Sequence, residues 1–253
     1  MSVRPFWNIE RRRVRQLILG RFVHNRTQRP AFDRTNETMT ASNAHGARAA
    51  GILLHAPGVY DLQVWLATGG RERRLREEML RLSRASEGER VLDVGCGTGT
   101  LAIMVAQLLG SSGEVAAIDA SPEMVARARR KADKARVAVD WREASAQALP
   151  FADARFDLVT STLMLHHLPR RDRDAFLREV RRVLKPGGRV LIVDFASSSR
   201  QQGGIAHLLH RFGRVPPAEI LALAESQGFV VAERGPLGVR DLQYVLATAR
   251  FAP

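Results

Sequence analysis

The sequence has little or none of three features that mark large classes of protein. Cys96 is the single cysteine among 253 residues, which excludes an intramolecular disulfide framework and a zinc site built from several cysteines. No apolar run approaches the roughly 20 residues that a membrane-spanning helix needs. The short LILG run in the basic N-terminal region does not make a signal-peptide core. We therefore expect a cytoplasmic protein without a transmembrane segment.

Lysine is also scarce, because only three of the 39 basic residues are Lys and the remainder are Arg. With 26 acidic residues, the formal net charge is +13. Apolar residues make up 45% of the chain and charged residues 26%, a balance typical of globular proteins that excludes disordered and collagenous classes. The length predicts one domain with an extension.

Much of the positive charge lies at the N-terminus, where residues 1–30 contain eight Arg and one acid, Glu10. Apolar Trp7, Leu17, Ile18 and Phe22 recur at roughly helical spacing, which predicts a basic amphipathic helix. Such a helix is consistent with three roles: a solvated or docked helix, adsorption of the protein to an anionic membrane surface, or a cleaved presequence or nucleic-acid arm.

Composition along the chain predicts its domain organisation. Residues 30–50 are small and polar, so we divide the chain into an arm and linker (1–50) and a domain (51–253). Within the domain, residues 51–88 are predicted to form a helical cap, which includes an amphipathic helix at 71–85, and residues 89–253 a core.

Short apolar runs alternate with helical patterns through the core. Strands are predicted at 91–95, 115–119, 137–141, 156–161, 189–195, 229–234 and 242–250, and helices at 101–110, 122–135, 173–185 and 218–228. This alternation predicts an α/β fold: a doubly wound, Rossmann-like sheet that is mostly parallel and covered on both faces. The last two strands lack an intervening helix, which favours an antiparallel hairpin.

The segment VLDVGCGTGTLAI places Asp93 at a strand end, followed by Gly95, Gly97 and Gly99. The third glycine of the dinucleotide fingerprint would fall at position 100, which is Thr, and no Gly-Lys-Ser/Thr follows as a P-loop requires. Asp119 ends the next strand, where a carboxylate accepts ribose hydroxyls. The carboxyl ends of these strands are expected to line one ligand crevice.

The segments VLDVGCGTGTLA, IDASPEM, ALPFADARFDLV and RRVLKPGGRVLIVDF together resemble class I S-adenosylmethionine-dependent methyltransferases, of the ubiquinone/menaquinone-biosynthesis type. The resemblance covers about residues 58–250 and implies a seven-stranded sheet with an antiparallel last strand. It also implies S-adenosyl-L-methionine as the cofactor.

The resemblance assigns roles to individual residues. It implies that Gly95, Gly97, Thr98 and Gly99 wrap the amino-acid part of the cofactor, in the crevice that Asp93 also lines. It further implies that Asp119 holds the ribose, Met124 packs against the adenine, and Ser145 and Ala146 lie at the adenine edge. Many members have Asp or Asn where this chain has Ser145. Thr162 matches a position beside the methionine part, and Tyr60 matches a tyrosine that covers the cofactor, although it could equally pack between helices.

Two histidines, His166 and His167, follow the fourth predicted strand in STLMLHHLP. Imidazole titrates in the range that suits a general base acting on a phenol or an activated carbon acid. The alternative is that one histidine packs and caps the next helix while the other faces solvent. His207 and His210 lie three residues apart, but no third ligand is evident, so we predict no metal site.

These features predict a methyltransferase that acts on a small, lipophilic acceptor, since 50–68 and 198–216 could form an apolar lid. A quinol carbon, a phospholipid amine, a thiol or a natural product would each fit. The alternatives are a non-catalytic S-adenosylmethionine-binding regulator or scaffold and a nucleic-acid methyltransferase. The last is disfavoured, because no Asn/Asp-Pro-Pro-aromatic motif follows the fourth strand. The expected partner is the small acceptor, and an anionic membrane surface that contacts residues 1–30 is one candidate partner among the roles left open for the arm.

Overall fold

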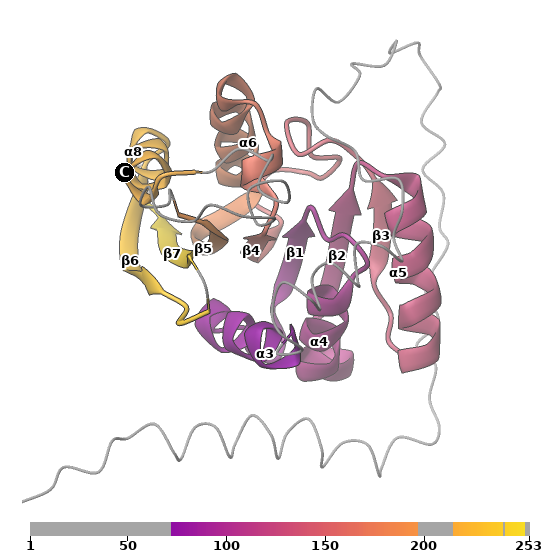
Figure 1. Ribbon diagram of the computed structural model, residues 1–253. Coiled ribbons are helices and arrows are strands. Elements are labelled where there is room, and N and C mark those ends of the chain that lie inside the picture. Colours follow the sequence, from indigo (N-terminus) through magenta and orange to yellow (C-terminus); the bar gives the residue numbers. More distant parts are fainter. Residues whose placement is uncertain (1–71, 197–214, 240, 251–253) are drawn as a thin grey trace, which may run out of the picture. The chain divides into compact units, whose positions relative to one another are not determined.

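The computed structural model describes residues 72–196, 215–239 and 241–250 (Figure 1). The predictions for the arm and linker, Tyr60, most of the cap, the lid segment at 50–68, nearly all of the lid segment at 198–216, His207 and His210 lie outside these residues. At the end of the second lid segment, Val215 is buried in the core. None of the helices in the described ranges has the length and apolar character needed to cross a membrane.

The sheet has seven strands in the order β3-β2-β1-β4-β5-β7-β6. Strands β1 to β5 are parallel, and β7 pairs antiparallel with both β5 and β6. The strands are β1 (Arg90–Val94), β2 (Glu114–Asp119), β3 (Asp140–Glu143), β4 (Phe156–Thr162), β5 (Leu184–Phe195), β6 (Phe229–Pro236) and β7 (Leu242–Ala249). The predicted Rossmann-like sheet with an antiparallel last strand is confirmed. Its strand order reverses between β1 and β4, where open α/β sheets bind ligands.

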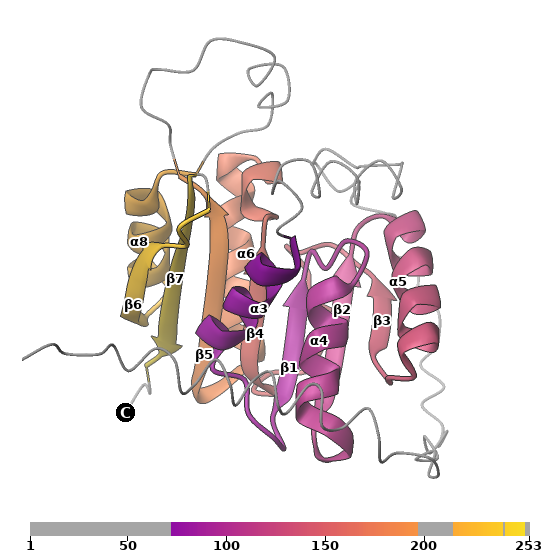
Figure 2. The ribbon, with the colours of Figure 1, turned by 60° about the horizontal axis from the view of Figure 1, so that its bottom comes forward.

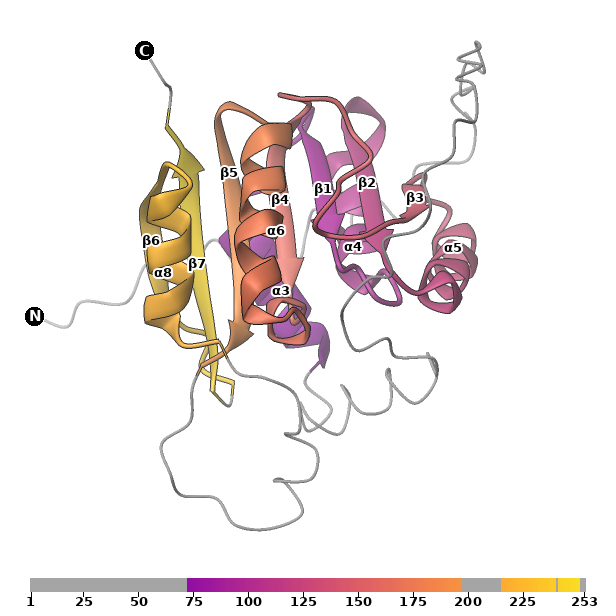
Figure 3. The same cartoon turned by 90° about the horizontal axis from the view of Figure 1, so that it is seen from above.

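Helices cover both faces of the sheet (Figures 1 and 3). On one face lie α3 (Glu72–Ser83), α4 (Thr100–Leu109) and α5 (Pro122–Ala135), and on the other α6 (Arg170–Val183) and α8 (Pro217–Ser226). Single 3-10 turns follow α4 and β4, at Gly110–Ser112 and Leu165–His167. Each face has its own apolar core, because side chains alternate along the strands: Val91 and Leu158 pack toward α3 and α4, and Leu92 and Val159 toward α6 and α8.

The strand predicted at 137–141 is shifted, since β3 runs from Asp140 to Glu143. Arg136 ends α5 in the left-handed conformation, with φ of 56°, and the N–H of Val137 still bonds to the Ala132 carbonyl. The chain therefore uses the next residues to return from the helix to the sheet. Val137 and Val139 are partly buried against the core there, which explains the apolar pattern without a strand.

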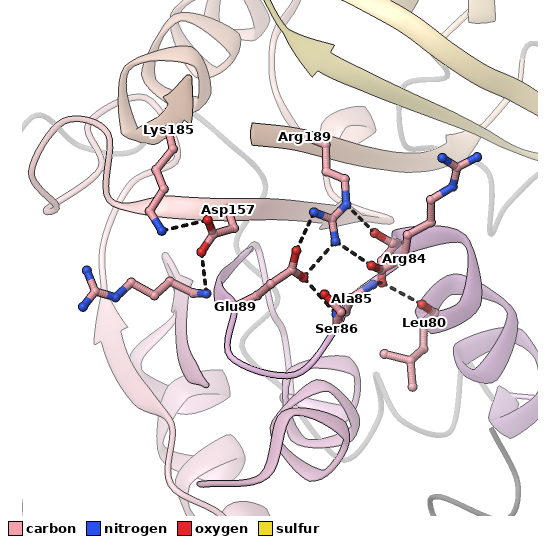
Figure 4. Close-up of polar contacts among 10 residues, drawn as sticks. Leu80, Arg84, Ala85, Ser86, Glu89, Asp157, Lys185 and Arg189 are labelled. Atoms are coloured by element: carbon pink, nitrogen blue, oxygen red, sulfur yellow. Dashed lines mark hydrogen bonds and ion pairs between the residues drawn. The ribbon is translucent and has the colours of Figure 1, made fainter. Parts of the chain in front are cut away.

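A polar cluster at the amino end of the sheet fastens the end of α3 to β5 (Figure 4). The guanidinium of Arg189 on β5 donates two bonds of 2.8 Å to the carboxylate of Glu89. It also donates to the carbonyls of Ser83 and Arg84, at 3.0 and 2.6 Å. The C-terminal end of α3 is held at the amino end of the sheet. The first turns of α3 therefore lie toward the carboxyl ends of β1 and β4 (Figure 2).

Candidate active site

The glycine loop after β1 depends on glycine for both conformation and space. Gly95, Gly97 and Gly99 have φ of 72°, 53° and 78°, in the left-handed region that glycine adopts without strain. The N–H of Gly95 donates to the Ile118 carbonyl at 2.9 Å, which joins the loop to β2. A Cβ on Gly95 would lie 2.2 Å from Cγ of Met164. The segment that follows β4 therefore packs directly against the loop.

Thr98 is buried within this loop, and its hydroxyl accepts a 3.0 Å bond from Nζ of Lys131 on α5. The same ammonium donates to Thr100 at 2.7 Å. Neighbouring Cys96 is not suited to nucleophilic chemistry, because burial raises the pKa of its thiol well above the usual value. Lys131 therefore joins the loop to α5, and the loop offers no nucleophilic thiol.

Asp119, at the end of β2, joins the glycine loop to the start of α5. One carboxylate oxygen accepts the N–H of Gly97 at 2.8 Å and the other accepts the N–H of Ser121 at 2.9 Å. Burial raises the pKa of this carboxyl group. Each oxygen has a second lone pair, so the carboxylate can still accept two ribose hydroxyls.

The residues expected at the adenine lie in the first turn of α5 and in the loop after β3. Ser121 caps α5 by accepting the N–H of Met124, and Met124 is buried. Ser145 and Ala146 follow β3, and the Ser145 hydroxyl donates to the side-chain oxygen of Gln147. That bond uses the hydroxyl proton, so Ser145 offers the adenine amine a neutral oxygen acceptor.

Asp93 and Thr162 face the α3–α4 side of the sheet at the ends of β1 and β4. The Thr160 hydroxyl donates to Asp93 at 2.8 Å, and the two residues are paired across the strands. Burial raises the pKa of Asp93 to about 6, against the opposing hydrogen bond from Thr160. Thr162 is buried, and its hydroxyl accepts a 3.4 Å bond from Nη1 of Arg76 on α3.

His166 forms a buried pair with Asp194, a residue that the sequence analysis missed. Nδ1 of His166 lies 2.6 Å from one oxygen of Asp194, and the other oxygen accepts the backbone N–H of His166 at 3.0 Å. Asp194 ends the apolar run RVLIVDF of β5. The same signal, a carboxylate at the end of a buried strand, singled out Asp93 and Asp119 and could have found it.

His167 lies beside His166, with ring centroids 4.0 Å apart. Burial, followed by the charge of His166, lowers the pKa of His167 to about 4, so its ring is neutral at physiological pH and weakly basic. Leu163, just before these residues, has φ of 57°, a strained conformation for a branched side chain. Strain at this point is typical of a functional segment.

The structure thus brings the expected residues that it describes to one edge of the sheet. Among the residues described, no group of three His, Cys, Asp or Glu side chains is arranged to hold a metal ion. The site offers two buried carboxylates, a loop in which three positions are glycine and a buried methionine. These features fit the ribose, the amino-acid part and the adenine of S-adenosylmethionine.

Comparisons with known proteins agree with this geometry. Residues 91–188 match the family model described as a methyltransferase domain. The chain is 35% identical over 182 residues to the ubiquinone/menaquinone biosynthesis C-methyltransferase UbiE of Teredinibacter turnerae, covering 71% of this chain and 72% of that protein. It is 34% identical over 186 residues to UbiE of Azotobacter vinelandii, covering 72% and 73%.

Solved structures show the same fold. A SAM-dependent methyltransferase from Aquifex aeolicus superposes with a TM-score of 0.61 at 26% identity, covering 77% of this chain and 99% of that one. The [4+2]-cyclase SpnF shares the fold at 21% identity, with a TM-score of 0.62 and coverage of 72% and 82%.

Fold and site together define a class I methyltransferase that uses S-adenosyl-L-methionine as its cofactor. This chain belongs to that family, as an enzyme that transfers methyl groups. Within the family it is a distant relative of the UbiE C-methyltransferases.

Proposed function

We propose that this enzyme methylates a ring carbon of a small, lipophilic, quinol-like acceptor, with His166 as the general base. The observation that carries the proposal is the buried His166–Asp194 pair, whose histidine lies in the segment packed against the glycine loop through Met164. The names of the relatives support the class of acceptor, because they describe C-methyltransferases of ubiquinone and menaquinone biosynthesis.

The chemistry needs a base because a phenolic hydroxyl has a pKa of about 10 and is protonated at neutral pH. The bound cofactor supplies a methyl group on a positively charged sulfur. Loss of the hydroxyl proton makes the ring carbon electron-rich, and its electron pair forms the new bond to the methyl carbon. When bound, the cofactor would keep the electron pair of its carbon–sulfur bond and leave as a neutral thioether. The proton of the ring carbon would pass through solvent to the ring oxygen, which restores the hydroxyl, and His166 would release the proton that it accepted to solvent. Positioning and exclusion of water supply the rest of the rate enhancement.

The bond between His166 and Asp194 prepares the histidine for this role. Because Nδ1 faces the carboxylate, Nε2 is the nitrogen that can accept a proton from a ligand. The carboxylate fixes the ring orientation and stabilises the imidazolium that forms. Asp194 is thus a positioning residue. We assign no proton transfer to His167, because its lowered pKa makes it a poor base.

The test replaces His166 with Asn, whose amide nitrogen can retain the bond to Asp194. We expect turnover to fall by about 10²–10⁴-fold, with the affinity for S-adenosylhomocysteine unchanged. The measurement follows labelled methyl transfer to a prenylated quinol, and binding by calorimetry. His167→Asn is the matched control and should keep most of the turnover. Turnover of His166→Asn within about threefold of the unaltered enzyme would contradict the role of His166.

The acceptor is tested in the same assay, with phospholipid amines and thiols offered in separate reactions. We expect label in the quinol and not in the other two. Label in an amine or a thiol instead would show that the acceptor class is wrong, although methyl transfer itself would stand. Running each reaction with and without liposomes separates acceptor solubility from acceptor chemistry.

A further inference from the structure

The segment 163–168, which carries His166, is strained where it begins. Leu163 has φ of 57° directly after β4, and its N–H donates to the Val193 carbonyl at 2.8 Å. Three residues further on, the backbone N–H of His166 donates to the carboxylate of Asp194. A strained backbone persists only where the surrounding structure holds it from several sides. Both of these bonds join the segment to β5, and neither holds its far end.

Arg173, on α6, holds that far end. Its Nε donates a 3.1 Å hydrogen bond to the carbonyl of Leu168, the residue that follows the 3-10 turn Leu165–His167. The N–H of Leu168 donates back into this turn, to the Leu165 carbonyl at 3.1 Å. His166 is the central residue of the turn. The bond from Arg173 therefore fixes the backbone on which the His166 side chain is mounted.

The second contact of Arg173 is with Glu219 on α8. Nη1 of Arg173 donates to Oε1 of Glu219 at 2.9 Å, and the arginine is buried. The two helices lie next to each other on one face of the sheet (Figure 3), where Phe176 and Ile220 belong to the same apolar core. Glu219 thus neutralises the buried guanidinium and helps to hold it against the Leu168 carbonyl.

Stability alone does not explain a buried ion pair at this place. Replacing such a pair with apolar side chains of similar volume is often neutral or stabilising, because the desolvation of two charges is costly. Apolar side chains already pack α6 and α8 into one core. The guanidinium of Arg173 does what an apolar side chain cannot do, because it donates a hydrogen bond to the Leu168 carbonyl.

We propose that Arg173 is a positioning residue for methyl transfer, which acts through the Leu168 carbonyl to hold the turn of His166 in the orientation that the reaction requires. Arg173 acts on the backbone and takes no part in proton transfer. This inference rests on the proposed role of His166 as the base. Loss of Arg173 should lower kcat, because small displacements of a catalytic group are costly, and should leave ligand binding nearly unchanged.

The experiment compares two variants of the full chain. Arg173→Met with Glu219→Gln removes the bond to Leu168 without leaving an unpaired buried carboxylate. Arg182→Met is the matched control, because Arg182 also lies on α6, pairs with Glu179 and donates to backbone carbonyls. Those carbonyls belong to the loop that precedes β4. Labelled methyl transfer to a prenylated quinol gives kcat and KM, and calorimetry gives the affinity for S-adenosylhomocysteine.

We expect the Arg173 variant to lower kcat at least about tenfold, with the KM for the quinol and the affinity for S-adenosylhomocysteine within about threefold. Arg182→Met should keep kcat within about threefold of the unaltered enzyme. If the Arg173 variant does not fold, Arg173→Lys carries the test, because it keeps a charge beside Glu219 without the planar fork that reaches both partners. An unchanged kcat, or equal losses of kcat in the Arg173 and Arg182 variants, would overturn the proposal.

A spectroscopic measurement separates this inference from the proposed base. Proton NMR without any acceptor follows the Nδ1 proton between His166 and Asp194, whose nitrogen and oxygen lie 2.6 Å apart. The signal should shift or broaden in the Arg173 variant and stay unchanged in Arg182→Met. An unchanged signal in the Arg173 variant would overturn the inference even where His166 is the base. The proposed base fails by a different result, which is turnover retained in His166→Asn.

Discussion

Asp93 combines an unusual pKa with a position that suits a cationic ligand group. Its carboxyl is protonated below about pH 6 in the free enzyme, because burial raises its pKa to about that value. An α-ammonium group prefers the ionised form. Cofactor affinity should therefore increase with pH until Asp93 is ionised.

We predict that the affinity for S-adenosylhomocysteine rises about tenfold between about pH 5 and pH 7, as the ionised fraction of Asp93 grows. Calorimetry across this range measures it. In Asp93→Asn the affinity should rise less over this pH range. The remaining rise should come from ionisation of Asp119, because burial also raises the pKa of Asp119. An identical pH dependence in Asp93→Asn would contradict the assignment.

The sequence revealed some of the residues in this site and not others. Gly95 and Asp119 belong to a contiguous pattern of strand, glycine loop and strand, so local spacing was enough to find them. Arg76 is one of several arginines in an amphipathic helix, and only tertiary packing separates it from exposed Arg73. The partnership of His166 with Asp194 joins residues 28 positions apart, which no local pattern encodes.

At the scale of elements, hydrophobic periodicity predicted the order and type of the strands and helices. It did not predict the residues at which some strands begin. The shifted start of β3 was set by the left-handed cap at Arg136 and the route back to the sheet, which apolar spacing does not specify. β5 begins at Leu184, earlier than predicted, because Leu184 pairs with Phe156 across a register shift. Tertiary pairing decides such boundaries.

The bonds between Glu89 and Arg189, which attach α3 to β5, are expected to stabilise the folded state in a way that depends on pH. Burial alone would raise the pKa of Glu89, but hydrogen bonds from Arg189 and the Ser86 N–H outweigh it and lower the pKa. Since the folded state lowers this pKa, the stabilisation is fully present above the unfolded value of 4.5 and is lost as pH falls through the folded value.

We therefore expect Glu89→Gln to lower the free energy of unfolding at neutral pH by about 1 kcal/mol, a discounted value for a partly exposed charged hydrogen bond. The difference in unfolding free energy between the two proteins should narrow as the pH falls below the unfolded value of 4.5 and through the lower folded value. Urea denaturation at several pH values measures both effects. Glu77→Gln, which removes the half-buried partner of exposed Arg73, is the control and should cost less than about 0.5 kcal/mol. If Glu89→Gln lowers the free energy of unfolding by the same amount at every pH, the prediction is contradicted.

At the scale of the whole molecule, the basic residues of the arm (1–30) lead us to predict that the protein binds to anionic membranes. Each arginine near an anionic leaflet contributes about 1 kcal/mol, and burial of apolar side chains such as Trp7 and Phe22 adds to this. We expect the full chain to co-sediment with anionic liposomes at low salt and to dissociate as salt screens the charges. Neutral liposomes should bind much less.

The control keeps the chain at full length and replaces Arg11, Arg12, Arg13 and Arg15 with Gln. This variant should lose most of its binding to liposomes, while its affinity for S-adenosylhomocysteine stays the same, because every cofactor residue proposed here lies at or beyond Tyr60. Equal sedimentation of the two proteins would show that the arm does not bind lipid through its charge.

The alternation of side chains along the strands separates two sets of residues within the site. Asp93, Asp119 and Thr162 face the layer that contains α3 and α4, whereas Asp194 faces the layer that contains α6 and α8. Substitutions in one layer therefore leave the contacts of the other largely intact. If His166 and Asp194 serve the acceptor as proposed, a duplicated gene could change its acceptor by mutation on the α6–α8 side while it inherits cofactor binding, provided that Met164 and Ala146 are kept, because these two residues of that core lie against the cofactor loop or at the expected adenine edge.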